Sequence, residues 1–352
     1  MTLILDDAAA TGKVDESNML SLMERASERL VVPEDAQSTC RLDIGRPLNV
    51  VLAGLGGSGI VGEILTDYCR NSVEVSVNVS RLVKIPRFVD KNTFFVAISY
   101  SGETVETLQM FEQARVAGAK LAVVCSGGKL LAEAQKYGVP HVKVASGMLP
   151  RVALPELVAA VTYVLGEAKI LEHSHQLLES GRSSMKEILS KVSADVPLKE
   201  NTAKQFATAL LGHLPILLGS EEYVSVLRRF KNELNENSKV PAFFYIFPEG
   251  FHDDIEGLGN LAKLAQPQPV ILRSQSQTIG EQRVNEKLGE LFSELKFPSP
   301  LFFEGVGSGL FEWLLSAITF GDFVSFYLAI LKGVDPSKMA LIRAFRAVRG
   351  QR

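Results

Sequence analysis

The stretch LAGLGGSGIVGEIL, Leu52 to Leu65, places five glycines within nine residues between two apolar runs. The run before the glycines, Val50 to Ala53, is continuous as in a buried parallel strand, and the apolar residues after them recur at helical spacing. The glycines therefore mark a turn from a strand into a helix. Glycine lets a ligand approach the backbone closely, and the unpaired N–H groups that open a helix attract anions. The stretch predicts a phosphate site in an α/β protein.

The same glycines leave a second interpretation open, because Gly54, Gly56 and Gly59 also satisfy the dinucleotide-binding pattern G-x-G-x-x-G. A nicotinamide site would require a carboxylate at the end of the next strand, to hold the ribose hydroxyls. That strand ends at Ser80-Arg81 without one, although an arginine there would suit the 2′-phosphate of NADP. The next motif along the chain favours a phosphate monoester over NADP.

A second strand, turn and helix follow in VAISYSGETVETLQMF, Val96 to Phe111. The turn contains Ser99, Ser101 and Thr104, so that three hydroxyls converge on the start of a helix. A phosphate monoester accepts many hydrogen bonds through its three terminal oxygens, and neutral hydroxyls can donate them without a lysine. Simple helix capping is the alternative for any one of these hydroxyls. Because the carboxyl ends of parallel strands lie at one edge of a sheet, this turn and the glycine turn can form one site.

The composition narrows the class of protein. The chain has 352 residues, which exceeds the usual size of a single domain, so we expect two. Its formal charge of −3 provides no basic surface for nucleic acid or an anionic membrane, and we expect neither as a partner. The three cysteines lack metal-binding spacing, and the N-terminus lacks the pattern of a signal peptide. These features are typical of a cytoplasmic protein with reduced thiols.

We expect four parts along the chain. They are an N-terminal helical arm over 1–48, a first α/β domain with the phosphate-binding loops over 49–154, a helical connector over 155–210, and a second α/β domain with C-terminal helices over 211–352. In both domains strand-like runs alternate with helical patterns, which is typical of parallel βαβ units. No turn of the second domain repeats SYSGET, so we expect one sugar-phosphate site per chain, formed mainly by the first domain.

The most apolar long stretch is LFEWLLSAITFGDFVSFYLAIL, Leu310 to Leu331. It contains Glu312 and Asp322 in its interior, and either carboxylate would be costly at the centre of a bilayer. We therefore expect a buried helix at a subunit or domain contact rather than a membrane span.

Three residues are candidates for the chemistry. Glu236 is expected near a helix end ahead of Pro241, and a carboxylate in a partly desolvated cleft can move a carbon-bound proton. The alternative is that Glu233, Glu236 and Lys239 form a solvated helix face. His252 follows a strand, and its imidazole titrates near neutrality, but a lone loop histidine can be incidental.

Arg151 is the third candidate. It begins a helix after a proline at a strand exit, where its fixed charge could stabilise an enediolate oxygen or form a surface ion pair. Among the five histidines only His173 and His175 are close in sequence, and residues two apart on a helix face different ways. We therefore expect no metal.

These motifs together resemble the bifunctional phosphoglucose/phosphomannose isomerases, a family of sugar isomerase (SIS) domain proteins. The family's segments occur here in order as GGSG, SYSGET, PRVAL, NENSKVPAF, FPEGFH, GDFVSFYLA and GVDP. They stand at Gly56–Gly59, Ser99–Thr104, Pro150–Leu154, Asn235–Phe243, Phe247–His252, Gly321–Ala329 and Gly333–Pro336. The resemblance covers roughly residues 49 to 350.

The resemblance implies two flavodoxin-like SIS domains, each a parallel sheet flanked by helices, in a homodimer. It implies isomerisation of glucose 6-phosphate and mannose 6-phosphate to fructose 6-phosphate through a cis-enediol, without metal or cofactor. Arg151 would stabilise the enediolate, Glu236 would shuttle the proton between C1 and C2, and His252 would assist ring opening across the dimer interface. The implied phosphate-binding residues are Gly57, Ser58, Ser99, Ser101 and Thr104.

The chain departs from the family pattern at two places. The segment after FPE reads GFHDDI, which keeps His252 but changes its neighbours, and Arg346 occupies the position of a family lysine. Arginine can bind a hydroxyl but cannot exchange a proton as lysine can. These departures keep a second hypothesis open, in which the chain is a sugar-phosphate-binding SIS regulator without turnover.

Overall fold

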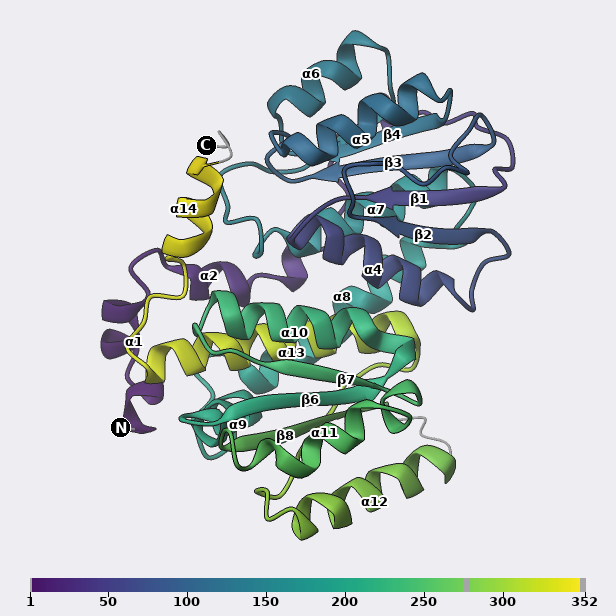
Figure 1. Cartoon of the computed structure of the whole chain (residues 1–352). Helices are drawn as coiled ribbons and strands as arrows, with labels where there is room; N and C mark the ends of the chain where they lie inside the picture. Colours follow the sequence, from purple (N-terminus) through teal and green to yellow (C-terminus); the bar gives the residue numbers. More distant parts are fainter. Residues whose placement is uncertain (1, 275–278, 349–352) are drawn as a thin grey trace. The chain divides into compact units, whose positions relative to one another are not determined.

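The computed structural model describes residues 2–274 and 279–348, and it divides the chain into two compact units (Figure 1). The first-sheet unit consists of Ala26–Arg182 and Ala340–Arg352, and the second-sheet unit of Met1–Arg25 and Ser183–Met339. Helix α8, Ser174–Val192, contains the boundary between Arg182 and Ser183. Each unit is built around one parallel sheet.

The sheet of the first-sheet unit has the strand order β2-β1-β3-β4-β5, and all its strands are parallel. This is the flavodoxin-like order, so the predicted fold class is confirmed. The strands are β1 Asn49–Ala53, β2 Ser76–Ser80, β3 Thr93–Ser99, β4 Lys120–Cys125 and β5 His141–Lys143. The chain order reverses between β1 and β3, where the two phosphate motifs leave the sheet.

Helices cover both faces of this sheet because alternate strand residues point to opposite sides. Val51 and Phe95 belong to a buried cluster with residues of α5 and α6. On the other face α4 approaches β1 so closely that a Cβ on Gly62 would lie 3.3 Å from Leu52 Cβ. The helices of the unit are α3 Ala36–Thr39, α4 Gly57–Cys69, α5 Val105–Val116, α6 Gly128–Lys136, α7 Leu154–Glu167 and α14 Ala340–Val348, with the 3₁₀ turn η2 Ser27–Arg29.

The sheet of the second-sheet unit has the order β7-β6-β8-β9 and is also entirely parallel. It repeats the first four positions of the other sheet, which confirms the predicted fold class of two parallel sheets. The strands are β6 Leu214–Ser220, β7 Phe243–Phe247, β8 Pro267–Arg273 and β9 Leu301–Glu304. The helices are α1 Ala8–Val14, α2 Met19–Glu24, α9 Thr202–Leu210, α10 Val224–Glu236, α11 Asp254–Leu261, α12 Ile279–Glu294 and α13 Leu310–Leu331, with the 3₁₀ turns η1 Thr2–Asp6, η3 Glu221–Tyr223 and η4 Glu249–Phe251.

Helix α13 is the buried helix that the sequence predicted. Among the described residues it alone is long and apolar enough to cross a membrane, but 94% of its most apolar window is buried inside the structure. It packs on α9, where Phe206 and Phe320 meet edge to face at 5.0 Å between centroids. It also packs on α10, where a Cβ on Gly321 would lie 3.0 Å from the ring of Phe230. Asp322, the next residue of α13, accepts hydrogen bonds from Arg229 of α10.

Candidate active site

Two glycines of the turn between β1 and α4 have no room for a side chain. A Cβ on Gly59 would lie 2.7 Å from the carbonyl oxygen of Gly54, and a Cβ on Gly54 would lie 2.8 Å from that of Ile98. Gly56 precedes α4 with φ of 56°, a conformation that L side chains rarely adopt. The N-terminal N–H groups of α4, beginning at Gly57, thus open at the carboxyl edge of the sheet, as a phosphate site requires.

The two predicted phosphate loops are joined directly. The backbone N–H of Tyr100, next to Ser99, donates to Ser58 Oγ across 3.2 Å. Ser99 Oγ and Thr104 Oγ1 lie 3.1 Å apart, and Ser101 Oγ accepts from the N–H of Glu103 at 3.2 Å. Thr104 is at the N-cap of α5, yet its side chain caps no helix N–H. The capping alternative therefore does not account for the Thr104 hydroxyl.

Arg151 lies beside the same loops. A Cβ added to Gly57 would be 3.9 Å from Arg151 Cα. Arg151 is only 4% exposed, so the alternative of a surface ion pair is wrong for this side chain. The segment after it is fixed by Arg29, whose Nη1 donates to the Val152 carbonyl at 2.7 Å and to Glu156 Oε1 at 3.0 Å. A buried arginine therefore has its backbone next to the N-terminus of α4.

Tyr100 is a residue of this site that the motifs alone did not single out. Its hydroxyl accepts from the N–H of Met148 at 2.9 Å, and its carbonyl accepts from the N–H of Ser126 at 2.8 Å. Tyr100 thereby connects Ser58, the end of β4 and the segment that leads to Arg151. Burial raises the pKa of Tyr100, so the hydroxyl stays protonated at neutral pH. The only indication in the sequence was that Tyr100 lies inside the SYSGET motif.

Glu236 is the last residue of α10 in the second-sheet unit and is half-buried. The alternative of a solvated helix face is wrong for Glu233, which is 1% exposed. Lys239 Nζ donates to the carbonyl of Glu236 at 2.7 Å and to that of Asn237 at 3.1 Å, which caps the helix. It also donates to the carbonyl of Asp335 at 3.0 Å, so the NENSK and GVDP motifs meet at this lysine.

His252 and Arg346 complete the predicted set. His252 follows β7 and η4, is exposed, and donates its backbone N–H to the carbonyl of Glu249 at 2.8 Å. Glu236 ends α10 where the chain is about to enter β7, so Glu236 and His252 lie at opposite edges of the second sheet. The unit does not bring these two residues together. The side chain of Arg346 lies outside the described residues.

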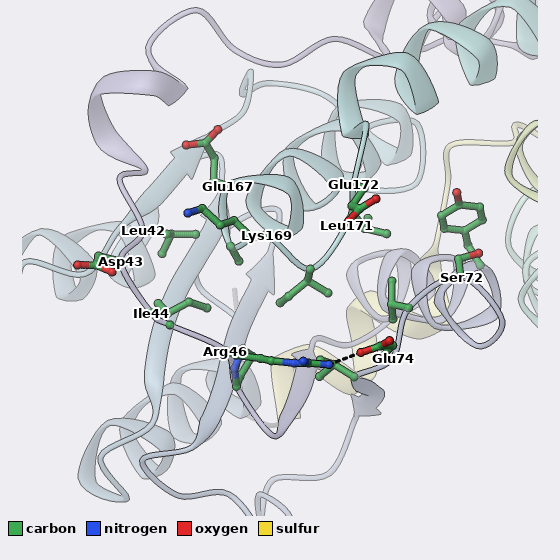
Figure 2. A pocket seen from close by; sticks show the side chains of 17 residues that line it. Leu42, Asp43, Ile44, Arg46, Ser72, Glu74, Glu167, Lys169, Leu171 and Glu172 are labelled. Atoms are coloured by element: carbon green, nitrogen blue, oxygen red, sulfur yellow. Dashed lines mark hydrogen bonds and ion pairs between the residues drawn. The ribbon is translucent and has the colours of Figure 1, made fainter.

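A large cavity in the first-sheet unit is separate from this site. It has a volume of about 840 Å³ and is lined by the segments that precede β1 and β2 and by the end of α7 (Figure 2). Arg46 pairs with Glu74 beside it, and Glu167, Lys169 and Glu172 also line it. It therefore lies at the amino edge of the sheet, opposite the phosphate loops, and contains no predicted site residue.

The second-sheet unit has a cavity of about 340 Å³ at the carboxyl edge of its sheet. Phe247 and Phe251 line it as a stacked pair, with ring centroids 4.2 Å apart. Tyr223, also in the lining, donates its hydroxyl to the carbonyl of Leu272 at 3.1 Å. The lining of this cavity is mostly apolar. Within the described part of the chain, no group of three or more His, Cys, Asp or Glu residues could hold a metal ion.

The two parallel sheets and the joined hydroxyl loops define the class of protein, an SIS-domain protein of the phosphosugar-isomerase fold. A glucose-6-phosphate isomerase-like protein from Thermus thermophilus shares this fold with a TM-score of 0.67 and 18% identity, over 98% of this chain and 99% of that one. Residues 199–348 match the family described as the bacterial phospho-glucose isomerase C-terminal SIS domain.

The sequence relatives identify the family more narrowly. The bifunctional phosphoglucose/phosphomannose isomerase of Thermoplasma acidophilum is 31% identical over 323 residues, 91% of this chain and 96% of that protein. The chain belongs to the family of bifunctional phosphoglucose/phosphomannose isomerases, which confirms the resemblance drawn from the motifs. A D-glucosamine-6-phosphate 4-epimerase of Sulfolobus acidocaldarius is 33% identical over 224 residues, 63% of this chain and 68% of that protein.

Proposed function

We propose that the chain is an enzyme that isomerises glucose 6-phosphate and mannose 6-phosphate to fructose 6-phosphate. The observation that carries the proposal is the contact between the two loops, in which Tyr100 N–H reaches Ser58 Oγ beside a buried Arg151. Hydroxyls and helix N–H groups there suit the phosphate, and the buried cation of Arg151 suits an oxygen that becomes negative during the reaction. Membership of the isomerase family supports the same substrates.

The mechanism that we propose moves one proton between adjacent carbons. The phosphate is held by the N–H groups from Gly57 onward and by the hydroxyls of Ser58, Ser99, Ser101 and Thr104. Glu236 takes the proton from C2 of the open-chain aldose and returns it to C1, while the proton on O2 moves to O1. Arg151 stabilises the oxygen of the cis-enediolate that forms between these two transfers. No metal or cofactor enters this scheme.

Ring opening is assigned to His252, with Arg346 binding a sugar hydroxyl. His252 and Glu236 lie at opposite edges of one sheet, which supports a homodimer in which the histidine of one protomer serves the site of the other. The chain is proposed to work in the cytoplasm, because Cys40, Cys69 and Cys125 are free and buried. The substrates are small hexose phosphates, and neither nucleic acid nor membrane is proposed as a partner.

The test is a coupled assay for fructose 6-phosphate with the purified protein, in EDTA, from glucose 6-phosphate and from mannose 6-phosphate. Turnover of both substrates is the expected result. Glucosamine 6-phosphate is assayed in parallel by NMR, because one relative is named as its 4-epimerase. Binding of hexose phosphates without turnover would replace the proposal with the regulator, and epimerisation at C4 alone would replace it with the epimerase.

A further inference from the structure

One face of α10 is polar and yet fully buried. Arg229, Glu233 and Asn237 are spaced four residues apart, so they form a single stripe along the helix and its C-cap. They are 2%, 1% and 0% exposed. Removing a charged pair from water costs several kcal/mol per ion, and packed apolar residues often serve stability as well. Stability alone therefore does not explain why these three residues are polar.

Arg229 connects this stripe to α13. Its Nε and Nη2 donate to the two carboxylate oxygens of Asp322, each at 3.0 Å, and its Nη1 lies 2.8 Å from Glu233 Oε1. Burial by itself would lower the pKa of Arg229, but the neighbouring carboxylates outweigh it and the pKa is raised. Glu236 is among the carboxylates that raise it. The guanidinium is therefore a permanent charge in the field of the last turn of α10.

Asn237 closes the connection at the end of the helix. Its Nδ2 donates to Glu233 Oε2 at 3.0 Å and to Ser325 Oγ at 2.9 Å. Ser325 Oγ in turn donates to the carbonyl of Asp322 at 2.8 Å. The buried circuit, defined as Arg229, Glu233, Asn237, Asp322 and Ser325, thus starts and ends on α13 and includes the residue next to Glu236.

We propose that the buried circuit is the positioning device for Glu236, with Arg229 as its central positioning residue. The last turn of a helix normally frays because its carbonyls lack partners. Here the circuit fixes the side of that turn that faces α13, and Lys239 caps its carbonyls. Misplacing a reacting group by about 1 Å can cost up to 100-fold in rate, so a base at a helix end requires such support. This inference rests on the proposed function, in which Glu236 moves the proton.

The test compares two identical changes on α13. Ser325 and Ser316 are both fully buried serines of this helix, but Ser316 bonds to Val306 and Trp313 and takes no part in the circuit. Ser325→Ala is expected to lower kcat about tenfold with KM within twofold of wild type. Ser316→Ala is expected to leave both constants unchanged, although each variant loses a few degrees of Tm.

A second variant tests the centre of the circuit. Arg229→Lys keeps the charge but loses the planar fork that bonds both carboxylates, and a larger loss of kcat than in Ser325→Ala is expected, again at constant KM. Wild-type kcat in folded Ser325→Ala and Arg229→Lys would overturn the proposal. An equal loss in Ser316→Ala, or a rise in KM that matches the loss in kcat, would also overturn it. Failure of the proposed function is seen separately, as absent turnover in the wild type.

Discussion

The carboxyl edges of the two sheets differ although the order of their first four strands is the same. At the first, a glycine turn and a hydroxyl turn leave β1 and β3 and bond to each other through Ser58 and Tyr100. At the second, the residues after β6 and β7 line an apolar cavity with a stacked Phe247 and Phe251. Parallel strands provide an edge where a ligand can bind, but the few side chains beyond each strand decide which ligand it is.

The second-sheet unit contributes to the proposed chemistry from its other edge. Its candidate base, Glu236, ends the helix that returns from β6 to the start of β7. The two units therefore differ in role, with phosphate recognition assigned to one and proton transfer to the other. Four predictions test this division, beginning with the largest expected effect.

Glu236→Gln is expected to lower kcat by about 10²- to 10⁴-fold, because the amide keeps the shape of the side chain but cannot accept the C2 proton. KM for glucose 6-phosphate should change little, since the phosphate loops belong to the other unit. Exchange of solvent deuterium into C2, followed by NMR, should be lost together with turnover. Normal turnover in a folded variant would contradict the division of roles.

Ser101→Ala is expected to raise KM by roughly tenfold and to lower kcat less, because a phosphate contact is present in the ground state and the transition state alike. Ser220 provides the matched control at the carboxyl edge of the second sheet. Each hydroxyl accepts from the N–H two residues later, at 3.2 Å in Ser101 and 3.3 Å in Ser220. Ser220→Ala should therefore leave KM unchanged. Equal effects on KM would show that the two edges do not differ in recognition.

Tyr100→Phe is expected to lower the free energy of unfolding by about 1–3 kcal/mol, because the N–H of Met148 loses its buried acceptor. A rise in KM of a few-fold should accompany it, since Tyr100 connects the two loops. Tyr223→Phe removes a buried hydroxyl at the other edge, one that donates to Leu272, and should cost stability without affecting KM. Denaturant unfolding and steady-state kinetics measure both quantities. An unchanged KM in Tyr100→Phe would remove the tyrosine from the site.

The smallest expected effect is on the pH dependence of stability, at Asp6, which is far from either phosphate loop in sequence. Its hydrogen bond from the buried Lys204, at 2.9 Å, holds the pKa of the Asp6 carboxyl below its ordinary value of about 3.9. A lowered pKa stabilises the fold above the ordinary value, and this contribution is lost as the pH falls through the lowered one. The difference in unfolding free energy between wild type and Asp6→Asn should therefore shrink as the pH falls below the ordinary carboxyl pKa of about 3.9. A difference independent of pH would contradict this, and KM should not change.

The sequence predicted most of the first-sheet unit because its signals are local. The glycines between β1 and the first turns of α4, and the hydroxyls after β3, each lie close together in sequence, where spacing alone indicates the structure. Arg151 and Glu236 became candidates in the same way, as polar residues at the ends of elements, and the family resemblance supplied their proposed roles. Predicting both parallel sheets required only the alternation of strand and helix.

The supporting residues were not predictable because their partners are distant in sequence. Asp322 argued against a membrane span, but its partner Arg229 lies 93 residues earlier. Glu233 was left as a possible solvated residue, since a helical period shows which residues share a face but not what covers it. The partners of Tyr100, Met148 and Ser58, are likewise distant in sequence. Such contacts belong to the tertiary structure.

The second-sheet unit combines a segment that precedes Ala26–Arg182 with one that follows it, and this affects the order in which the parts of the unit can assemble. Ser17 bonds to Ser337 at 2.8 Å and Glu16 pairs with Lys338 at 2.8 Å, contacts between residues about 320 apart. A ribosome completes the strands of the first sheet long before residue 337 emerges, so Ala26–Arg182 can begin to fold while residues 1–25 still lack their partners near residue 337. A segment that is synthesised before the first sheet is thus incorporated into its own unit after that sheet is complete.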